Sequence, residues 1–182
     1  MGQNNKGLPP ASVIYTAEEI DAALQKLAAE LQPIVAEGDV VLLGIMMGAM
    51  VPLVRISQLL DGDFQLDTCH ATRYEAGLEG KELAWVKQPG LDMHGKTVIV
   101  FDDIFDQGIT LEAVVAACQA NGAAKVVSAV LATKDHEDQR SDYRPDFSAL
   151  MVPNRYVFGY GMDYKHHWRH LPEIYALDEG AE

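Results

Sequence analysis

The chain is poor in cysteine and in positive charge. Only Cys69 and Cys118 are cysteines among 182 residues, too few for a disulfide framework, so we expect free thiols and a reducing, cytoplasmic location. Fourteen Lys and Arg stand against 27 Asp and Glu, which gives a net charge of −13. Because such a chain repels polyanions and anionic lipid surfaces, we expect neither a nucleic-acid partner nor a membrane partner.

A long uninterrupted apolar run is also missing. The longest run, residues 40–53, contains Gly44, Gly48 and Pro52, and it is shorter than the roughly 18–20 residues of a transmembrane helix. Residues 1–10 are polar and lack the apolar core of a signal peptide, so we expect a flexible N-terminal arm. A hydrophobic content of 48% and a length of 182 residues suit a single globular domain over residues 1–182.

Helical periodicity occurs in three places. Thr16-Ala-Glu-Glu19 forms a capping box before a periodic apolar run, which we expect Pro33 and Gly38 to end. Residues 110–121 and 48–60 also have helical spacing. The core positions expected in the 48–60 helix are Met50, Leu53, Val54 and Leu60.

Short apolar or alternating runs lie between these helices. They predict strands over residues 40–45, 64–71, 83–87, 97–101, 126–131, 149–152, 155–160 and 173–177. Strands that alternate with helices through short connections favour right-handed crossovers. The predicted fold class is therefore α/β, with a central, mostly parallel sheet flanked by helices.

The most informative stretch follows the expected strand at residues 97–101. Two adjacent acids, Asp102 and Asp103, lead into a glycine-containing turn at residues 106–110 and then into a helix. Helix N-termini bind phosphate groups, and paired carboxylates suit ribose hydroxyls or a hard cation such as Mg²⁺. A simple acidic helix cap is the competing interpretation, but a cap needs only one acid or hydroxyl.

This stretch resembles the motif that binds 5-phosphoribosyl-1-pyrophosphate (PRPP) in type I phosphoribosyltransferases. Asp106, Gly108 and Thr110 match the motif, while Gln107 replaces its usual first threonine. The resemblance implies that the two adjacent acids hold the ribose hydroxyls and that the turn binds the 5′-phosphate. The implied PRPP-binding residues are Asp102, Asp103, Asp106, Gln107, Gly108, Ile109 and Thr110.

The C-terminal part narrows the resemblance. Residues 155–164, Trp168-Arg169 and Leu171-Pro172, with Tyr143-x-Pro-Asp-Phe147 upstream, resemble hypoxanthine-guanine phosphoribosyltransferases. This resemblance implies that Tyr156 stacks on the purine, that the main chain of Val157 contacts its edge, and that Lys134 donates to O6. It makes Asp106 the catalytic base at purine N7. It also implies that Asp163 lies near the purine and a magnesium ion, which Asp102 and Asp103 help to hold, and that Arg169 contacts pyrophosphate.

The same resemblance implies a small hood lobe, a lid and an oligomer. The hood would combine the N-terminal arm with the segment near residues 148–182, and the lid would begin at Arg73 and Tyr74. The substrates would be PRPP and a 6-oxopurine base. Relatives with this pattern are commonly homodimers or homotetramers.

One loop departs from the pattern of the resemblance. The pyrophosphate loop of the family carries a lysine or arginine after the strand, whereas Gly44-Ile-Met-Met-Gly48 places Met47 there. The implied pyrophosphate contacts therefore come from Met46, Met47 and Gly48. The resemblance also implies a cis peptide bond in this loop, which here would join Met46 to Met47. Arg73 is a candidate to replace the missing cation.

Purine salvage, the conversion of hypoxanthine or guanine with PRPP into IMP or GMP and pyrophosphate, is the leading hypothesis. A transferase that prefers xanthine is one alternative. A non-catalytic PRPP-binding regulator is another, but the RNA-binding regulators of this kind need a basic surface, and the charge of −13 disfavours one. His166 and His170 have the spacing of helical zinc ligands, yet no cysteine or third ligand lies nearby in the sequence, so we expect a polar surface there.

Overall fold

The computed structural model describes residues 7–73, 83–135 and 142–180. The expected lid from Tyr74 onward, at residues 74–82, and most of the expected N-terminal arm lie outside this range, as do residues 136–141. The elements in chain order are β1 (Ala11–Tyr15), α1 (Ala17–Ala36), β2 (Val40–Ile45), α2 (Met50–Leu59), β3 (Phe64–Arg73), β4 (Leu83–Lys87), β5 (Thr97–Phe105), α3 (Ile109–Ala120), β6 (Lys125–Asp135), β7 (Phe147–Pro153), β8 (Val157–Phe158) and β9 (Ile174–Leu177).

A six-stranded sheet forms the centre of the molecule, with the strand order β4-β3-β2-β5-β6-β7. All neighbouring pairs from β3 to β7 are parallel, and the edge strand β4 is antiparallel to β3. The fold class predicted from the sequence is confirmed. Because β2, β5 and β6 run in the same direction, the loops after them meet at one edge of the sheet, where ligands bind in such folds.

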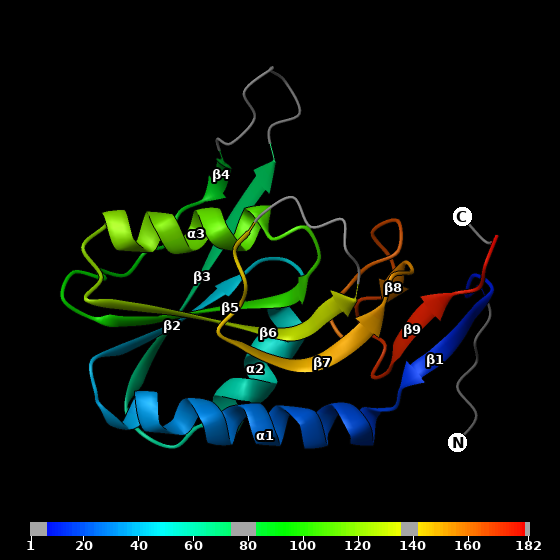
Figure 1. The fold of residues 1–182 in the computed structure, drawn as a ribbon, viewed down its shortest axis with the longest axis horizontal. Coiled ribbons are helices and arrows are strands. Elements are labelled where there is room, and N and C mark those ends of the chain that lie inside the picture. Colours follow the sequence, from blue (N-terminus) through cyan, green and yellow to red (C-terminus); the bar gives the residue numbers. More distant parts are fainter. Residues whose placement is uncertain (1–6, 74–82, 136–141, 181–182) are drawn as a thin grey trace.

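Helices cover both faces of the sheet (Figure 1). Helices α1 and α2 pack against one face in a core cluster that includes Leu42, Ile99 and Phe101, and α3 packs against the other in a cluster that includes Val41, Val98 and Val100. Successive residues of a strand point to opposite faces, which is why strand β2 and the apolar first half of β5 supply both clusters. The sheet is therefore a rigid platform for the loops at its edge.

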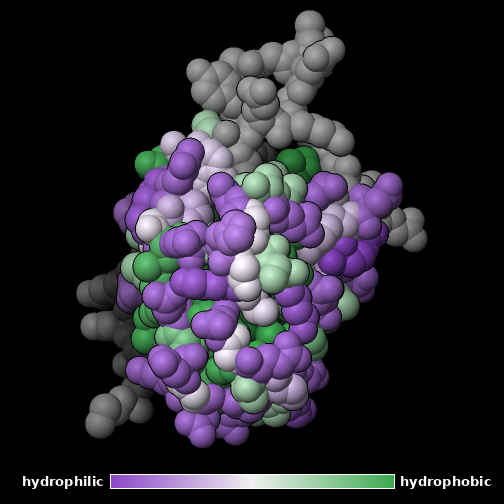
Figure 2. Space-filling model, turned by 90° about the vertical axis from the view of Figure 1, so that its left-hand side faces the viewer, coloured by the Kyte–Doolittle hydropathy of each residue, from purple (hydrophilic) through white to green (hydrophobic). Residues whose placement is uncertain are grey.

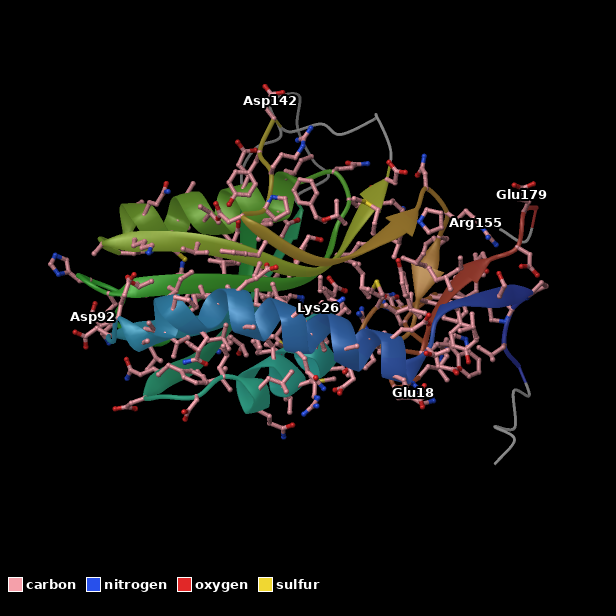
Figure 3. The ribbon with its side chains drawn as sticks, turned by 60° about the horizontal axis from the view of Figure 1, so that its bottom comes forward. Glu18, Lys26, Asp92, Asp142, Arg155 and Glu179 are labelled. Atoms are coloured by element: carbon pink, nitrogen blue, oxygen red, sulfur yellow. The ribbon has the colours of Figure 1, made fainter. Side chains whose placement is uncertain are left out.

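A second sheet of three antiparallel strands, β1-β9-β8, lies at one end of the molecule (Figure 1). Strand β1 pairs with β9 from Ala11 opposite Leu177 to Tyr15 opposite Ile174. The sequence did not predict β1, since its partner lies at the other end of the chain. Arg155 donates from Nε to the carbonyl of Leu177 at 2.7 Å, and Figure 3 shows it near Glu179 at the end of this sheet.

Helix α1 begins as predicted and ends just before Gly38 as predicted, but Pro33 does not end it. Thr16 Oγ1 accepts from the amide of Glu19 at 3.3 Å, and Glu19 Oε2 accepts from the amide of Thr16 at 2.9 Å, which confirms the capping box. Pro33 lies inside the helix instead of ending it. Its lost amide removes one hydrogen bond, while the buried Ile34 and Val35 still pack into the core beyond it.

The core side of α2 was predicted only in part. Leu53 and Leu60 are buried as expected, whereas Met50 and Val54 are 42% and 51% exposed. Apolar residues occur all around this short helix, so their spacing alone does not select the inner face.

Both cysteines are free, as predicted, and both are buried. Burial raises the pKa of the Cys69 thiol to about 12 and that of Cys118 to about 11. Among the described residues, no helix combines the length and the apolar character needed to cross a membrane. The end of the molecule away from the second sheet is mainly hydrophilic, with apolar residues in scattered small patches (Figure 2).

Candidate active site

The two adjacent acids lie within strand β5. We expected the strand to end at Phe101, but β5 continues through Asp102 and Asp103 to Phe105, in register with β6. Each carboxylate accepts from the next backbone amide: Asp102 Oδ1 from Asp103 N at 2.9 Å, and Asp103 Oδ1 from Ile104 N at 2.8 Å. The strand ladder and these local bonds hold both acids in place.

Burial sets the charge behaviour of this acidic pair. It raises the pKa of Asp102 well above the usual range, and the negative charge of Asp103 adds to the effect. Burial also raises the pKa of Asp103, although the hydrogen bond with Asp102, the amide of Ile104 and the charge of Arg169 oppose it. A cation or hydroxyl donors would stabilise the charged forms of the buried Asp102 and the partly buried Asp103.

The turn from Asp106 to Thr110 joins β5 to α3 at the predicted place. Gly108 has φ of 80° and forms the N-cap of α3, a left-handed conformation that glycine adopts without a steric penalty. Glycine has no side chain to cap the helix, so the amides of the first helical turn face the turn itself. An α-helix N-terminus in this setting is suited to bind a phosphate group.

The loop between β2 and α2 lies directly against the acids. The peptide bond between Met46 and Met47 is cis, as the resemblance implied. A Cβ placed on Gly48 would lie 1.8 Å from Asp103 Oδ2, so only glycine allows this approach. A Cβ on Gly161, which has φ of 107°, would lie 2.1 Å from the carbonyl oxygen of Gly48. Gly48 and Gly161 therefore allow close approach between the β2–α2 loop, strand β5 and the segment around residue 161.

A cavity of about 200 Å³ opens at this edge of the sheet. Lys134, near the end of β6, points its Nζ to Asp106 Oδ2 at 3.3 Å. These residues are 28 positions apart in the sequence, and the pairing of β5 with β6 brings them together. The cavity is lined by Asp103, Ile104, Asp106, Lys134, Tyr156, Val157, Met162 and Asp163.

The wall of the cavity includes two residues that the sequence did not indicate. Ile104 and Met162 supply apolar surface to the same cavity as the half-exposed ring of Tyr156. Tyr156 itself contacts Tyr164 edge-on, with ring centroids 5.4 Å apart and an interplanar angle of 85°. Ile104 directly follows Asp103, and Met162 directly precedes Asp163. Their position next to these acids in the sequence could have indicated that they line the site.

Arg169 and Asp163 form an ion pair beside this cavity. Arg169 Nη2 lies 2.6 Å from Asp163 Oδ1, and its Nη1 donates to the carbonyl of Gly161 at 2.6 Å. The amide of His166 donates to Asp163 Oδ2 at 2.8 Å. Arg169 and Asp163, the two residues implied for pyrophosphate and metal binding, therefore lie side by side. The positive charge of Arg169 also acts to lower the pKa of Asp103.

The side chains of two implied site residues, Arg73 and Tyr74, are outside the described part of the structure. Arg73 is the last residue of β3, and its side chain is outside the described part of the structure. Tyr74 lies outside the described residues altogether. The lid assignment therefore stays a prediction. The other implied residues lie on the loops after β2 and β5, at the ends of β5 and β6, or in the segment from 156 to 169.

The carboxylates at this edge of the sheet could supply part of the coordination of a magnesium ion. Among the described residues, no group of three His, Cys, Asp or Glu side chains lies close enough to hold a metal alone. Magnesium usually keeps several waters and binds one or two carboxylates together with substrate oxygens. The buried Asp102 and the partly buried Asp103 fit such a partial site, because burial raises the pKa of both carboxyls and a bound cation would stabilise their charged form.

The fold and the grouped residues define a class of protein that binds a phosphorylated sugar beside an aromatic-lined pocket. The family model described as "Phosphoribosyl transferase domain" matches residues 11–165, most of the chain. The chain belongs to the phosphoribosyltransferase family, within the group of the hypoxanthine-guanine phosphoribosyltransferases.

Individual relatives agree with this assignment over nearly their whole lengths. The chain is 30% identical over 168 residues to a "Hypoxanthine-guanine phosphoribosyltransferase" of Streptococcus pneumoniae, covering 92% of the chain and 93% of the relative. It is 28% identical to the "Hypoxanthine-guanine-xanthine phosphoribosyltransferase" of Tritrichomonas foetus, covering 93% and 92%. A crystal structure of a hypoxanthine phosphoribosyltransferase from Staphylococcus aureus superposes with a TM-score of 0.86 at 25% identity, covering 92% and 91% of the two chains.

Proposed function

We propose that the chain transfers the 5-phosphoribosyl group of PRPP to hypoxanthine or guanine and releases pyrophosphate. The observation that carries this proposal is the Lys134–Asp106 pair, 3.3 Å apart in a cavity that Tyr156 also lines. A cation, a carboxylate and an aromatic face in one small cavity match the three features of a 6-oxopurine: its O6, its N7 and its flat ring.

The proposed reaction forms one bond and breaks one. Purine N9 attacks the ribose C1, and the bond from C1 to the pyrophosphate oxygen breaks. Asp106 accepts the proton that the base gives up at N7, which makes N9 a better nucleophile. Lys134 donates to O6, where negative charge collects as the proton leaves. Arg169 would hold the departing pyrophosphate.

The paired acids Asp102 and Asp103 would hold the ribose hydroxyls and, with Asp163, a magnesium ion. When bound, magnesium supplies positive charge that stabilises the pyrophosphate leaving group. The backbone of Met46, Met47 and Gly48 would bind pyrophosphate from the other side. The turn of Asp106, Gln107, Gly108, Ile109 and Thr110 would bind the 5′-phosphate through amides at the start of α3.

The test is an ultraviolet assay with PRPP and Mg²⁺ that offers hypoxanthine, guanine, xanthine and adenine in parallel. Turnover of hypoxanthine and guanine with adenine inert is the expected result, because the amino group at position 6 of adenine cannot accept a hydrogen bond from Lys134. Turnover of adenine at a similar rate would remove Lys134 from its proposed role. PRPP binding without turnover of any base would favour a non-catalytic PRPP-binding regulator.

A xanthine-preferring transferase is the second candidate. The relative from Tritrichomonas foetus bears xanthine in its name, and it is 28% identical to this chain. The preference depends on contacts at purine position 2, and the same assay ranks the bases directly. Xanthine as the best substrate would leave the proposed mechanism in place and change only the specificity.

We also propose a cytoplasmic enzyme that works as a homodimer or homotetramer. Two buried free thiols support a reducing compartment. The three-stranded sheet with β8, next to Tyr156, would act as the hood over the purine. The lid that begins at Arg73 and Tyr74 would exclude water from PRPP during the reaction.

A further inference from the structure

Four aromatic rings follow one another in contact from the interior of the second sheet to the cavity. Tyr175 of β9 stacks on Phe158 of β8, with ring centroids 5.4 Å apart and an interplanar angle of 14°. Phe158 contacts Tyr164 at a centroid distance of 5.9 Å, and Tyr164 contacts Tyr156 edge-on at 5.4 Å. We name Tyr175, Phe158, Tyr164 and Tyr156 the aromatic column. The column ends at a ring that lines the cavity.

The inner half of the aromatic column is fixed by the sheet. Phe158 and Tyr175 are direct partners in the antiparallel pairing of β8 with β9 (Figure 1), and they are 0% and 4% exposed. Cross-strand aromatic pairs of this kind stabilise a sheet, and close packing restricts the rotamers of buried side chains. This half of the column is therefore a firm support for the rings outside it.

The outer end of the aromatic column is more exposed. Tyr156 directly precedes β8, and its ring is 42% exposed. Because Tyr156 and Phe158 are two residues apart, the alternation of an extended chain places both rings on the same face. Tyr164 contacts both of them, so its ring links the exposed ring to the buried pair.

Tyr164 acts from behind the wall of the cavity. Tyr156 and Asp163 are among the described residues that line the cavity, whereas Tyr164 is not. The Tyr164 ring packs instead against the buried cluster formed by Phe158, Leu171, Tyr175 and Leu177. A side chain in this position can orient a stacking ring without touching a ligand itself.

The backbone of Tyr164 is fixed by a tight turn. Its amide donates to the carbonyl of His167 at 3.1 Å, and the amide of His167 donates to the carbonyl of Tyr164 at 2.9 Å. Lys165 and His166, between them, have φ of 51° and 66°. This left-handed conformation is unfavourable for residues with a side chain and persists only where the surroundings enforce it.

Asp163 supplies contacts that hold this turn. Its Oδ2 accepts from the amide of His166 at 2.8 Å, and its Oδ1 accepts from Arg169 Nη2 at 2.6 Å. The charges of this pair also act on Tyr156: burial raises the pKa of the Tyr156 hydroxyl, Asp163 raises it further, and Arg169 opposes the increase. The Asp163–Arg169 pair therefore fixes the place from which the Tyr164 ring reaches Tyr156.

We propose that Tyr164 is a positioning residue for purine binding, which holds the ring of Tyr156 against the cavity in the orientation that stacks on the base. This inference deepens the proposed function and rests on it. A ring that turns freely must be ordered when the base binds, and that ordering reduces the net gain from stacking. Removal of the Tyr164 ring therefore weakens the binding of the purine and leaves the 5′-phosphate contacts of the β5–α3 turn unchanged.

The first experiment compares variants by steady-state kinetics with hypoxanthine. Tyr164→Leu should raise the KM for hypoxanthine by about 2–10-fold, the contribution of one aromatic pair, and change the KM for PRPP less than about two-fold. Tyr164→Phe keeps the ring and should match wild type. The matched control is Tyr160→Leu, in the same segment, since Tyr160 packs against the core cluster under α1 and α2; it should keep the wild-type KM for hypoxanthine. Equal increases of both KM values in Tyr164→Leu, or no rescue by phenylalanine, overturn the proposal.

A double variant tests whether Tyr164 acts through Tyr156. In the Tyr156→Ala background the stacking ring is absent, so the addition of Tyr164→Leu should not raise the KM for hypoxanthine further. An increase of the same size in both backgrounds would mean that Tyr164 affects the base by another route, and it would overturn the proposal.

The orientation of the ring can be measured without substrate. In protein with isotope-labelled tyrosine, nuclear Overhauser effects between the rings of Tyr156 and Tyr164 are expected, since their centroids are 5.4 Å apart. The Tyr156 signals, identified by their loss in Tyr156→Ala, should shift in Tyr164→Leu and stay nearly in place in Tyr164→Phe. Missing effects in wild type overturn the proposal even if Tyr164→Leu fails to fold. Because this readout needs no turnover, failure of the positioning role and failure of the proposed function are distinguished.

Discussion

Two strand–turn–helix units, β5–α3 and β2–α2, have neighbouring strands in the sheet but present different chemical groups at its edge. In β5–α3, the chain brings Asp102, Asp103 and Asp106 to the edge of the sheet and turns through the left-handed Gly108. In β2–α2, residues 44–54 carry no ionisable side chain at all. Both units lie at the same edge of the sheet, and Gly48 of one touches Asp103 of the other.

The difference between the two units shows how one edge of the sheet can bind both a cation and an anion. The carboxylates of β5 suit hydroxyl groups and a cation, whereas backbone amides, which point from a turn without side-chain charges, suit an anion. Because the β2–α2 loop carries no side-chain charge, an anion there would be bound by backbone amides alone.

The largest effect is expected from removing the charge of the β5–α3 turn. Asp106→Asn keeps the shape and the contact with Lys134 but cannot accept a proton, so turnover should fall by about 10²–10⁴, the usual worth of a general base. PRPP affinity should change little. Steady-state kinetics and PRPP titration measure the two quantities. Asp135→Asn, at an exposed acid at the end of β6, is the matched control; equal losses in both variants would refute the assignment.

The next effect comes from the contact between the two units. Gly48→Ala introduces a Cβ 1.8 Å from Asp103 Oδ2, so the loop or the acid must move. We expect a loss of about 1–3 kcal/mol in the free energy of unfolding, as in overpacked cores, together with weaker PRPP binding. Gly90→Ala is the control, because its nearest neighbour is 3.9 Å away. Thermal melts compare the two, and equal melting temperatures would show that the close approach is not needed.

A smaller effect, in the opposite direction, is expected for the buried acid of β5. The pKa of Asp102 is raised from 3.8 by burial and by Asp103, so the folded state holds its proton where the unfolded state has released it. The free energy of unfolding therefore falls as pH rises from 3.8 through the raised pKa. Asp102→Asn removes this penalty and should melt at a higher temperature than wild type at neutral pH, with little difference in acid.

Melting curves over a pH series test this directly. Asp135→Asn, whose carboxylate is exposed, should follow wild type at every pH. A variant Asp102→Asn that is less stable than wild type at neutral pH would mean that the carboxylate is compensated in the folded state. Activity should fall in Asp102→Asn even as stability rises, because the implied contact with ribose is lost.

The smallest effect is expected from adding the positively charged side chain that the β2–α2 loop lacks. Met47→Lys restores the cation of the family pattern and should tighten PRPP or pyrophosphate by a few-fold, since an exposed charge pair contributes about 0.2–1 kcal/mol. Isothermal titration measures the change. Met151→Lys, at another exposed methionine, is the control. Unchanged affinity would mean that the backbone of the loop is sufficient.

The sequence by itself determined the features that depend on neighbours within a few residues. The capping box of Thr16 and Glu19, the parallel strands and the glycine at the start of α3 follow from local spacing. The acids of β5 and the Asp106 turn form one contiguous motif, so their order is visible without a structure. Even the departure at Met47 can be read from the chain, because the pattern around it is otherwise intact.

Only the tertiary structure decided which separated residues meet and which surfaces remain open. It brings Lys134 to Asp106, joins β1 to β9 across the length of the chain, and continues α1 through Pro33. It also adds Ile104 and Met162 to the cavity and leaves Met50 and Val54 in contact with solvent. Burial is the sum of contacts from distant segments, and a local pattern of apolar residues does not contain that information.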